Sequence, residues 1–294
     1  MANTELSKSK RLDQYVVERF PQLSRAYAVR LIEHGRVTVN GQTEKPGYKL
    51  RRTDQVEIDF DPSELDAIPD IELPVLYEDD DVVVVDKPSG VISHARGRYW
   101  DEPSVASFIR SRFSARAFDA DNPAGATRAG IVHRLDRATS GVMICAKNPD
   151  ALKVLQRQFG ERSVKKVYRA VVVGQPEPLE AIIDMPIGRN PAAPSTFRID
   201  AAGKYAITHY KTLSYENGRA QLELTPQTGR THQLRVHLQQ IGHPIVGDVL
   251  YGGTQAERLY LHAWRLEITL PSGERKTFEA PIPAVFGDEE QPCA

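Results

Sequence analysis

The sequence predicts an α+β protein in which a small α/β domain precedes a larger domain built on a mixed, mainly antiparallel sheet. Its 294 residues allow about two domains at roughly 150 residues each. Strand-like segments outnumber helical ones and follow one another along the chain, which argues against a doubly wound fold. An acidic stretch with three prolines at 61–74 is typical of a linker and divides the two parts.

Two helices and a small sheet are expected in the first domain, residues 8–60. Apolar side chains recur at every fourth position in 12–20, which is helical spacing. Ser24 is a suitable N-cap for a second helix, and Gly35 is a suitable stop for it. The dipeptide Asn40-Gly41 follows alternating valines and predicts a tight hairpin turn.

The second domain is expected to span 75–287, followed by an acidic tail at 288–294. Its first strand, 82–87, begins with four consecutive valines, which indicates burial on both faces. A helix is expected over 103–113, because Pro103 suits a first helical turn and no glycine interrupts the run.

The remaining elements follow from shorter apolar patterns. In 151–159 the apolar side chains fall on one face of a helix and leave basic side chains outward. Another helix is expected at 231–241. Strands are expected at 142–146, 167–173, 205–215, 221–225 and 260–270.

The charge is balanced overall but segregated along the chain. With 38 basic and 39 acidic residues the net charge is −1, which alone argues against a nucleic-acid partner. However, seven basic and three acidic residues lie in 8–36, and ten basic and three acidic residues lie in 128–169. Segregated positive faces hold a phosphate backbone despite a neutral total. The alternative interpretation is a set of ordinary solvated helix faces.

Cysteine content and hydropathy point to the cytoplasm. The two cysteines, Cys145 and Cys293, lie far apart, so neither a disulfide scaffold nor a cysteine zinc site is expected. No run of about 18 apolar residues is present, so no membrane helix is expected. The polar N-terminus predicts no secretory signal. A reducing cytosol is therefore the expected compartment.

The densest cluster of chemically useful residues lies in 130–141. Asp136 stands between Arg134 and Arg137, and a turn-forming Thr-Ser-Gly follows at 139–141. Nearby cations favour the ionised carboxylate, which a nucleophile requires. From spacing alone, an exposed Arg–Asp pair at a turn is the favoured explanation of the cluster.

This cluster resembles the signature of the RluA-type family of pseudouridine synthases. His-Arg-Leu-Asp at 133–136, a preceding glycine and the closing Thr-Ser-Gly all match. Further resemblance lies at 86–90 (Asp-Lys-Pro-Ser-Gly), 166–170, 228–237 (Thr-Gly-Arg-Thr-His-Gln-Leu-Arg-Val-His), 247–248 and 261–263. The resemblance covers about 75–285. Residues 11–58 resemble the small RNA-binding domain of ribosomal protein S-four, also called the alpha-L motif.

The family resemblance implies isomerisation of uridine to pseudouridine within RNA. The reaction is redox-neutral and adds no water, so the resemblance implies neither a cofactor nor a metal. A glycosidase would use two carboxylates, whereas this motif offers one, which fits isomerisation better than hydrolysis. The resemblance makes Asp136 the essential residue, acting either by attack on the sugar or by removal of a sugar proton.

Roles are expected for five further residues, four of them from the resemblance. Tyr168 matches the active-site tyrosine, which would stack on the uracil and assist proton removal from its carbon 5. Arg230 matches the arginine that would pair with Asp136 and keep it ionised. Arg134 matches an arginine that would enter the RNA stack where the target uridine leaves. Leu261 would form the wall beneath the base, and a core leucine is the alternative. His133 is expected to orient the Asp136 loop rather than bind a metal. With Arg134, these residues are the expected substrate-binding set.

RNA is the expected partner, and phosphate contacts are expected from basic residues of both domains. These residues are Lys8, Lys10, Arg11, Arg25, Arg30, Lys165 and Lys166. Large-subunit ribosomal RNA is the favoured substrate, transfer RNA is the alternative, and the chain is expected to act as a monomer without a membrane.

Two other functions are alternatives to an RNA pseudouridine synthase. A non-catalytic RNA-binding or ribosome-assembly factor would need none of Asp136, Tyr168 and Arg230. A metal-dependent hydrolase could use the later histidines and an aspartate, but their spacing is wide for zinc ligands. These residues are His232, His237, His243 and Asp248.

Overall fold

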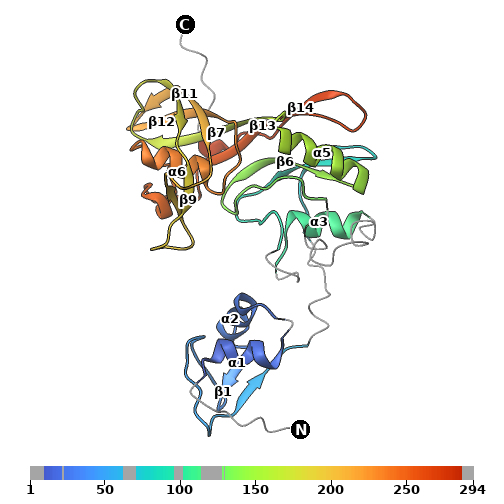
Figure 1. The fold of residues 1–294 in the computed structure, drawn as a ribbon, viewed down its shortest axis with the longest axis vertical. Helices are drawn as coiled ribbons and strands as arrows, with labels where there is room; N and C mark the ends of the chain where they lie inside the picture. The colour runs from blue at the N-terminus through green and yellow to red at the C-terminus, as the bar shows by residue number, and fades with distance from the viewer. Residues whose placement is uncertain are drawn as a thin grey trace. The chain divides into compact units, whose positions relative to one another are not determined.

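The structure is a computed structural model that describes residues 10–21, 23–61, 71–95, 102–113, 128 and 130–286. Lys8, most of the predicted linker and the predicted tail at 288–294 lie outside these ranges. The chain divides near residue 68 into two compact units, a small N-terminal unit and a larger unit (Figure 1). Within the described ranges, no helix is long and apolar enough to cross a membrane.

The small unit packs two helices on a short antiparallel sheet. Its elements are α1 (Leu12–Arg19), α2 (Arg25–Glu33), β1 (Val37–Val39), β2 (Gln42–Thr43) and β3 (Val56–Ile58), with strand order β2-β1-β3. Ser24 caps α2 by accepting the amide of Tyr27. Asn40 and Gly41 both have positive φ, at 52° and 75°, which confirms the predicted hairpin turn.

The larger unit is built on one twisted sheet. In the described part of the chain its strand order is β4-β5-β6-β13-β7-β12-β11-β8, with β14 beside β13. The strands are β4 (Val75–Glu78), β5 (Val82–Lys87), β6 (Ser140–Ala146), β7 (Lys165–Val173), β8 (Glu180–Asp184), β11 (Ile207–Glu216), β12 (Arg219–Pro226), β13 (Leu261–Thr269) and β14 (Arg275–Glu279). Only the β6–β13 pairing among these is parallel, so the predicted mixed, mainly antiparallel sheet is confirmed.

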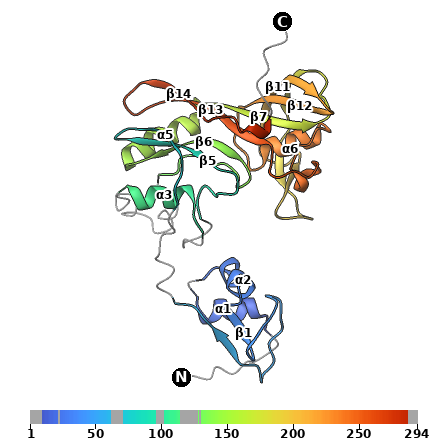
Figure 2. The ribbon, with the colours of Figure 1, turned by 180° about the vertical axis from the view of Figure 1, so that it is seen from behind.

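Helices cover the two ends of this sheet differently. Figures 1 and 2 show α3 (Val105–Arg112) and α5 (Pro149–Glu161) at the end that holds β6, and α6 (Gln233–Gln240) at the end that holds β11 and β12. A hairpin of β9 (Ile187–Arg189) and β10 (Phe197–Ile199) packs near α6, as does the short turn η3 (Val249–Tyr251). A second 3-10 turn, η4, covers Ala284–Phe286.

The segments that carry the family motifs meet at the centre of the sheet. β13 pairs in parallel with the start of β6 and antiparallel with β7, so the ends of three distant segments meet. Gly141 has φ 117°, and a Cβ built there would lie 2.2 Å from the carbonyl oxygen of Ala263. Only glycine fits this crossing, which explains the glycine that closes the Thr-Ser-Gly turn.

Some predicted boundaries are wrong. The helix expected from Pro103 begins at Val105, because Ser104 forms a capping box with Ser107. The helix expected from 231 begins at Gln233, because His232 adopts a left-handed conformation with φ 57°. Strands β4, β8 and β14 were not predicted; each lies at an edge of the sheet, where exposed positions blur the apolar alternation.

Candidate active site

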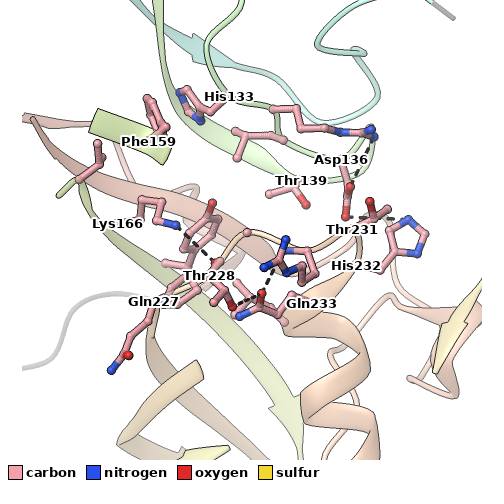
Figure 3. A pocket seen from close by; sticks show the side chains of 18 of the residues that line it. His133, Asp136, Thr139, Phe159, Lys166, Gln227, Thr228, Thr231, His232 and Gln233 are labelled. Atoms are coloured by element: carbon pink, nitrogen blue, oxygen red, sulfur yellow. Dashed lines mark hydrogen bonds and ion pairs between the residues drawn. The ribbon is translucent and has the colours of Figure 1, made fainter. Parts of the chain in front are cut away.

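A cavity of about 440 Å³ opens where these motifs meet, a volume suited to a small-molecule group such as a flipped nucleotide (Figure 3). Four parts of the chain line it: the loop at 132–139, the end of α5 with the start of β7, the turn at 226–235, and Leu261. Asp136 is the single carboxylate among the described lining residues.

The Asp136 carboxylate is held loosely. Its side chain is 18% exposed, and the Nη2 of Arg134 and the Nε2 of His232 each lie 3.9 Å from it (Figure 3). Both distances exceed a hydrogen bond. In the described part of the chain, neither carboxylate oxygen therefore has a hydrogen-bond donor, and both remain open to a substrate.

The backbone around Asp136, by contrast, is held tightly by the 86–93 segment. The fully buried ammonium of Lys87 donates to the carbonyl oxygens of Pro88 at 2.9 Å, Val91 at 2.7 Å and Arg137 at 3.3 Å. Burial lowers the pKa of Lys87 to about 7, while the charge of Asp136 acts in the opposite direction.

Two serines of this segment form hydrogen bonds with the backbone of the same loop. The hydroxyl of Ser89 donates to the carbonyl oxygen of Ala138 at 2.8 Å, and the hydroxyl of Ser93 donates to that of Leu135 at 2.8 Å. The backbone on both sides of Asp136 is thus anchored while its side chain is free. The segment 86–90 is part of the family resemblance, but the sequence did not predict that it holds the backbone of the Asp136 loop.

Tyr168 lies on β7 and lines the cavity, as predicted. Burial and the charge of Asp136 raise the pKa of its phenol above the ordinary value, so the ring is neutral. Among the described residues no group hydrogen-bonds to its hydroxyl.

The predicted ion pair between Arg230 and Asp136 is wrong. Arg230 lines the cavity, but its Nε donates to the main-chain oxygen of Tyr205 at 2.9 Å. Arg230 precedes α6, and its amide donates to the Oε1 of Gln233 at 3.0 Å, which closes the turn. Among the described residues, the Arg230 guanidinium therefore binds a main-chain oxygen and forms no ion pair with the carboxylate.

Arg235, which the sequence analysis did not single out, lies on the buried face of α6 and lines the cavity. Its Nε and Nη2 each donate to Asp248 at 2.7 Å, a bidentate pair, and its guanidinium lies 4.8 Å from the centre of the Tyr251 ring. The available signal was an arginine at an apolar helix position inside the matched motif.

His232 connects Asp136 to this buried group. Its Nδ1 lies 2.7 Å from the hydroxyl of Tyr251, and its Nε2 faces Asp136. Desolvation lowers the pKa of His232 despite the opposing charge of Asp136, so the ring is neutral near pH 7. The contact with Asp136 is therefore a polar neighbour and not a full ion pair.

The other predicted pocket residues also line the cavity. Leu261 is buried at the start of β13. The ring of His133 stacks on Phe159, and its Nε2 accepts the amide of Ile144 at 3.1 Å. Burial lowers the pKa of His133 to about 3, so this ring is a neutral structural contact beside the loop. Lys166, predicted as a surface RNA contact, lines the cavity, and burial lowers its pKa to about 8.

The basic residues predicted to bind RNA differ in their surroundings. Arg11 and Arg25 both bind the buried Asp13, so they hold the small unit together. Lys10 pairs with Glu18, and the Arg30 guanidinium lies 5.3 Å from the centre of the Tyr27 ring. Lys165 is exposed at the start of β7.

The candidate metal ligands are not gathered. His237 is buried between the Thr208 hydroxyl and the Met185 carbonyl, and His243 binds the Val173 carbonyl. Within the residues that the structure describes, no three His, Cys, Asp or Glu side chains form a group that could hold a metal ion.

Comparison with known proteins identifies the family. A family profile described as RNA pseudouridylate synthase matches residues 81–240, and one described as S4 domain matches 10–56. The chain is 36% identical over 292 residues to ribosomal large subunit pseudouridine synthase D of Neisseria meningitidis, covering 93% of this chain and 76% of that protein. It is 34% identical over 296 residues to the protein of the same name from Pseudomonas aeruginosa, covering 94% and 90%.

A solved structure agrees with the sequence relatives. The structure of human RNA Pseudouridylate Synthase Domain Containing 1 aligns with a TM-score of 0.58 and 30% identity, covering 71% of this chain and 83% of that one. The cavity lies within the segments that match the synthase profile, apart from Leu261. The chain belongs to the RluA-type family of RNA pseudouridine synthases and carries an S4 domain at its N-terminus.

Proposed function

We propose that the chain converts specific uridines of large-subunit ribosomal RNA to pseudouridine, with Asp136 as the essential residue. The observation that carries this proposal is the single pocket carboxylate, which is fixed through its backbone and has no hydrogen-bond donor among the described residues. The ribosomal substrate is supported by the names of the two bacterial relatives and by the S4 domain.

The isomerisation breaks the bond between ribose carbon 1′ and uracil nitrogen 1, and forms a bond between carbon 1′ and uracil carbon 5. Carbon 5 then loses a proton, and nitrogen 1 gains one. Asp136 starts the reaction either by attacking the ribose or by taking a ribose proton, and both routes need an ionised carboxylate close to the sugar. Arg134 lies 3.9 Å from this carboxylate, and Arg235 and Lys166 add basic side chains to the lining of the same cavity.

Tyr168 and Leu261 complete the base site in this proposal. A neutral tyrosine ring offers a flat surface to the uracil, and its open hydroxyl can bond to the base once water is displaced. Leu261 supplies the apolar wall. Arg134 has a side chain that is 56% exposed at the rim, which suits it to fill the gap left when the uridine leaves the RNA stack.

The small unit is proposed to hold the RNA backbone. Arg11 and Arg25 retain side-chain exposures of 43% and 57% beside Asp13, so their outer nitrogens still reach solvent. Lys8, Lys10 and Arg30 of this unit are proposed as further phosphate contacts, and Lys165 is proposed as one on the larger unit. Phosphate contacts would position the RNA without reading its sequence.

The test is pseudouridine mapping by carbodiimide treatment and reverse transcription of total RNA. Cells with the wild-type chain, with no chain and with Asp136→Ala are compared. We expect a stop in large-subunit ribosomal RNA that is lost in both deficient strains. A lost stop in transfer RNA would instead establish the alternative substrate, and unchanged stops with Asp136→Ala would refute the role of that residue.

A further inference from the structure

An exposed aromatic ring, Tyr205, lies at the mouth of the cavity and is not part of the site described above. It is 49% exposed and belongs to the connection between β10 and β11. Its carbonyl oxygen accepts the Nε of Arg230, and the guanidinium of Arg162 lies 5.9 Å from its ring centre. Because Arg162 and Arg230 both line the cavity, Tyr205 stands at its edge.

The spacing between Arg162 and Tyr205 is the widest of the cation–ring contacts among the described residues, and the next is 5.6 Å, between Arg189 and Phe197. Arg235 lies 4.8 Å from the Tyr251 ring centre, and Arg169 lies 4.0 Å from the Trp264 ring centre. At 5.9 Å the Arg162 contact is close to the outer limit of a cation–π interaction, about 6 Å. A flat base between two planes needs about 7 Å, twice the carbon contact distance of roughly 3.5 Å.

Arg162 is free to widen this gap by the missing distance of about 1 Å. It is exposed at the end of α5, where its backbone has φ 59°. Within the residues that the structure describes, its side chain has no hydrogen bond or ion pair. Arg235, in contrast, is fixed by two hydrogen bonds to Asp248.

We propose that Tyr205 and Arg162 form a stacking site for one unpaired base of the substrate RNA, adjacent to the target uridine. This inference rests on the proposed function, since it assumes an RNA whose uridine enters the cavity. A uridine that leaves its stack exposes the face of the neighbouring base. Single-stranded bases stack on aromatic rings and on arginine planes in RNA-binding proteins. Arg230 would then lie beside the connecting phosphate.

The test measures binding of a short fluorescent oligouridylate to the full chain by anisotropy at several salt concentrations. Tyr205→Ala should raise Kd about tenfold, within the range measured for loss of one base–aromatic stack. Tyr205→Phe should stay within about twofold, because the ring remains. Tyr215→Ala is the matched control: this tyrosine is 47% exposed on β11, where it pairs with Ala220, which does not line the cavity.

Salt dependence separates stacking from charge. Tyr205→Ala removes no charge and keeps the main-chain oxygen that Arg230 binds, so the slope of log Kd against log salt should not change. Arg162→Ala should raise Kd as well, and should lower the slope by no more than about 0.7, the value for one phosphate contact. A Tyr205→Ala chain that binds like wild type, or a wild-type chain that does not bind oligouridylate, would overturn the inference.

Failure of the proposed function would look different. If the wild-type chain forms no pseudouridine in any RNA while Tyr205→Ala still weakens oligouridylate binding, the catalytic proposal fails and the stacking site stands. If pseudouridine forms and Tyr205→Ala leaves both Kd and KM unchanged, the stacking site fails alone. On a converted RNA, we expect Tyr205→Ala to raise KM and leave kcat unchanged.

Discussion

Two aspartates, one in each unit, are surrounded by arginines but are held in opposite ways. Asp13 in the small unit is 1% exposed and accepts four hydrogen bonds of 2.8 to 3.0 Å from Arg11 and Arg25. Asp136 in the larger unit is 18% exposed, and Arg134 and His232 each lie 3.9 Å from it. Hydrogen bonds from Arg11, followed by those from Arg25, lower the pKa of Asp13 despite desolvation.

The difference separates a carboxylate engaged in the fold from one that is open to a ligand, as the proposed role of Asp136 requires. A carboxylate whose lone pairs all accept hydrogen bonds stabilises the fold and cannot act on a substrate without breaking those bonds. Asp136 keeps its lone pairs open, and its position is set through the backbone by Lys87, Ser89 and Ser93. The larger unit has its own hydrogen-bonded aspartate, Asp248, whose two carboxylate oxygens each accept a hydrogen bond from Arg235.

The sharpest test of this contrast is Asp136→Asn. The substitution keeps the shape of the side chain and removes its charge, so kcat should fall at least about 10⁴-fold, or roughly 5 kcal/mol in activation free energy. The melting temperature should not fall, because no hydrogen bond to the carboxylate is lost. Pseudouridine formation and thermal unfolding measure the two effects; a marked loss of stability would contradict the comparison.

Lys87→Met tests whether the backbone anchor positions Asp136. The methionine fills the buried space but donates no hydrogen bond to the Arg137 carbonyl, so the loop should shift. A misplacement of about 1 Å costs on the order of 10²-fold in rate, and we expect that loss in kcat with little change in KM. Lys147→Met is the control, since Lys147 binds Glu78 away from the cavity; equal losses in both variants would remove the positioning role.

Asp13→Ala should have the reverse effect of the Asp136 substitution. Loss of the buried carboxylate should destabilise the small unit by about 3 kcal/mol, at the low end for a buried pair because both arginines are partly exposed. Amide hydrogen exchange in α1 and α2 measures this, and kcat at saturating RNA should stay unchanged. Glu18→Ala, at an exposed carboxylate, should cost less than about 0.5 kcal/mol.

The smallest effect concerns acid stability of the larger unit. Desolvation lowers the pKa of the buried His262 to about 4, while its contact with the Ala280 carbonyl opposes this shift. The unfolded chain therefore binds more protons below pH 6.5, and the free energy of unfolding should fall by about 2 kcal/mol between about pH 7 and pH 5. The contribution of His262 to the free energy of unfolding is fully present above about pH 6.5 and is lost as the pH falls towards 4.

Urea denaturation measures the free energy of unfolding at each pH. In His262→Gln its fall between about pH 7 and pH 5, the acid limb, should be smaller, since glutamine does not titrate. His34→Gln, at an exposed histidine of the small unit, should leave the limb as it is in the wild type. An identical slope in the wild type and His262→Gln would show that another group controls acid unfolding.

The sequence by itself determined the two units, the mixed sheet and the carboxylate. Local signals were sufficient for these features: Asn40-Gly41 requires positive φ, four consecutive valines require a doubly buried strand, and the His-Arg-Leu-Asp run marks Asp136. The family resemblance also predicted Tyr168 and Leu261 as site residues. In the structure both line the cavity, because β7 and β13 pair with each other.

Only the tertiary structure decided which cations serve which purpose. Arg230 and Arg235 stand five positions apart in one motif. With α6 starting at Gln233, the first binds the main-chain oxygen of Tyr205 and the second is buried against Asp248. The anchor from Lys87 reaches a residue fifty positions away. Composition and spacing report that positive charges are present, but hydrogen-bond partners distant in sequence determine whether each charge is buried in the fold or left for RNA.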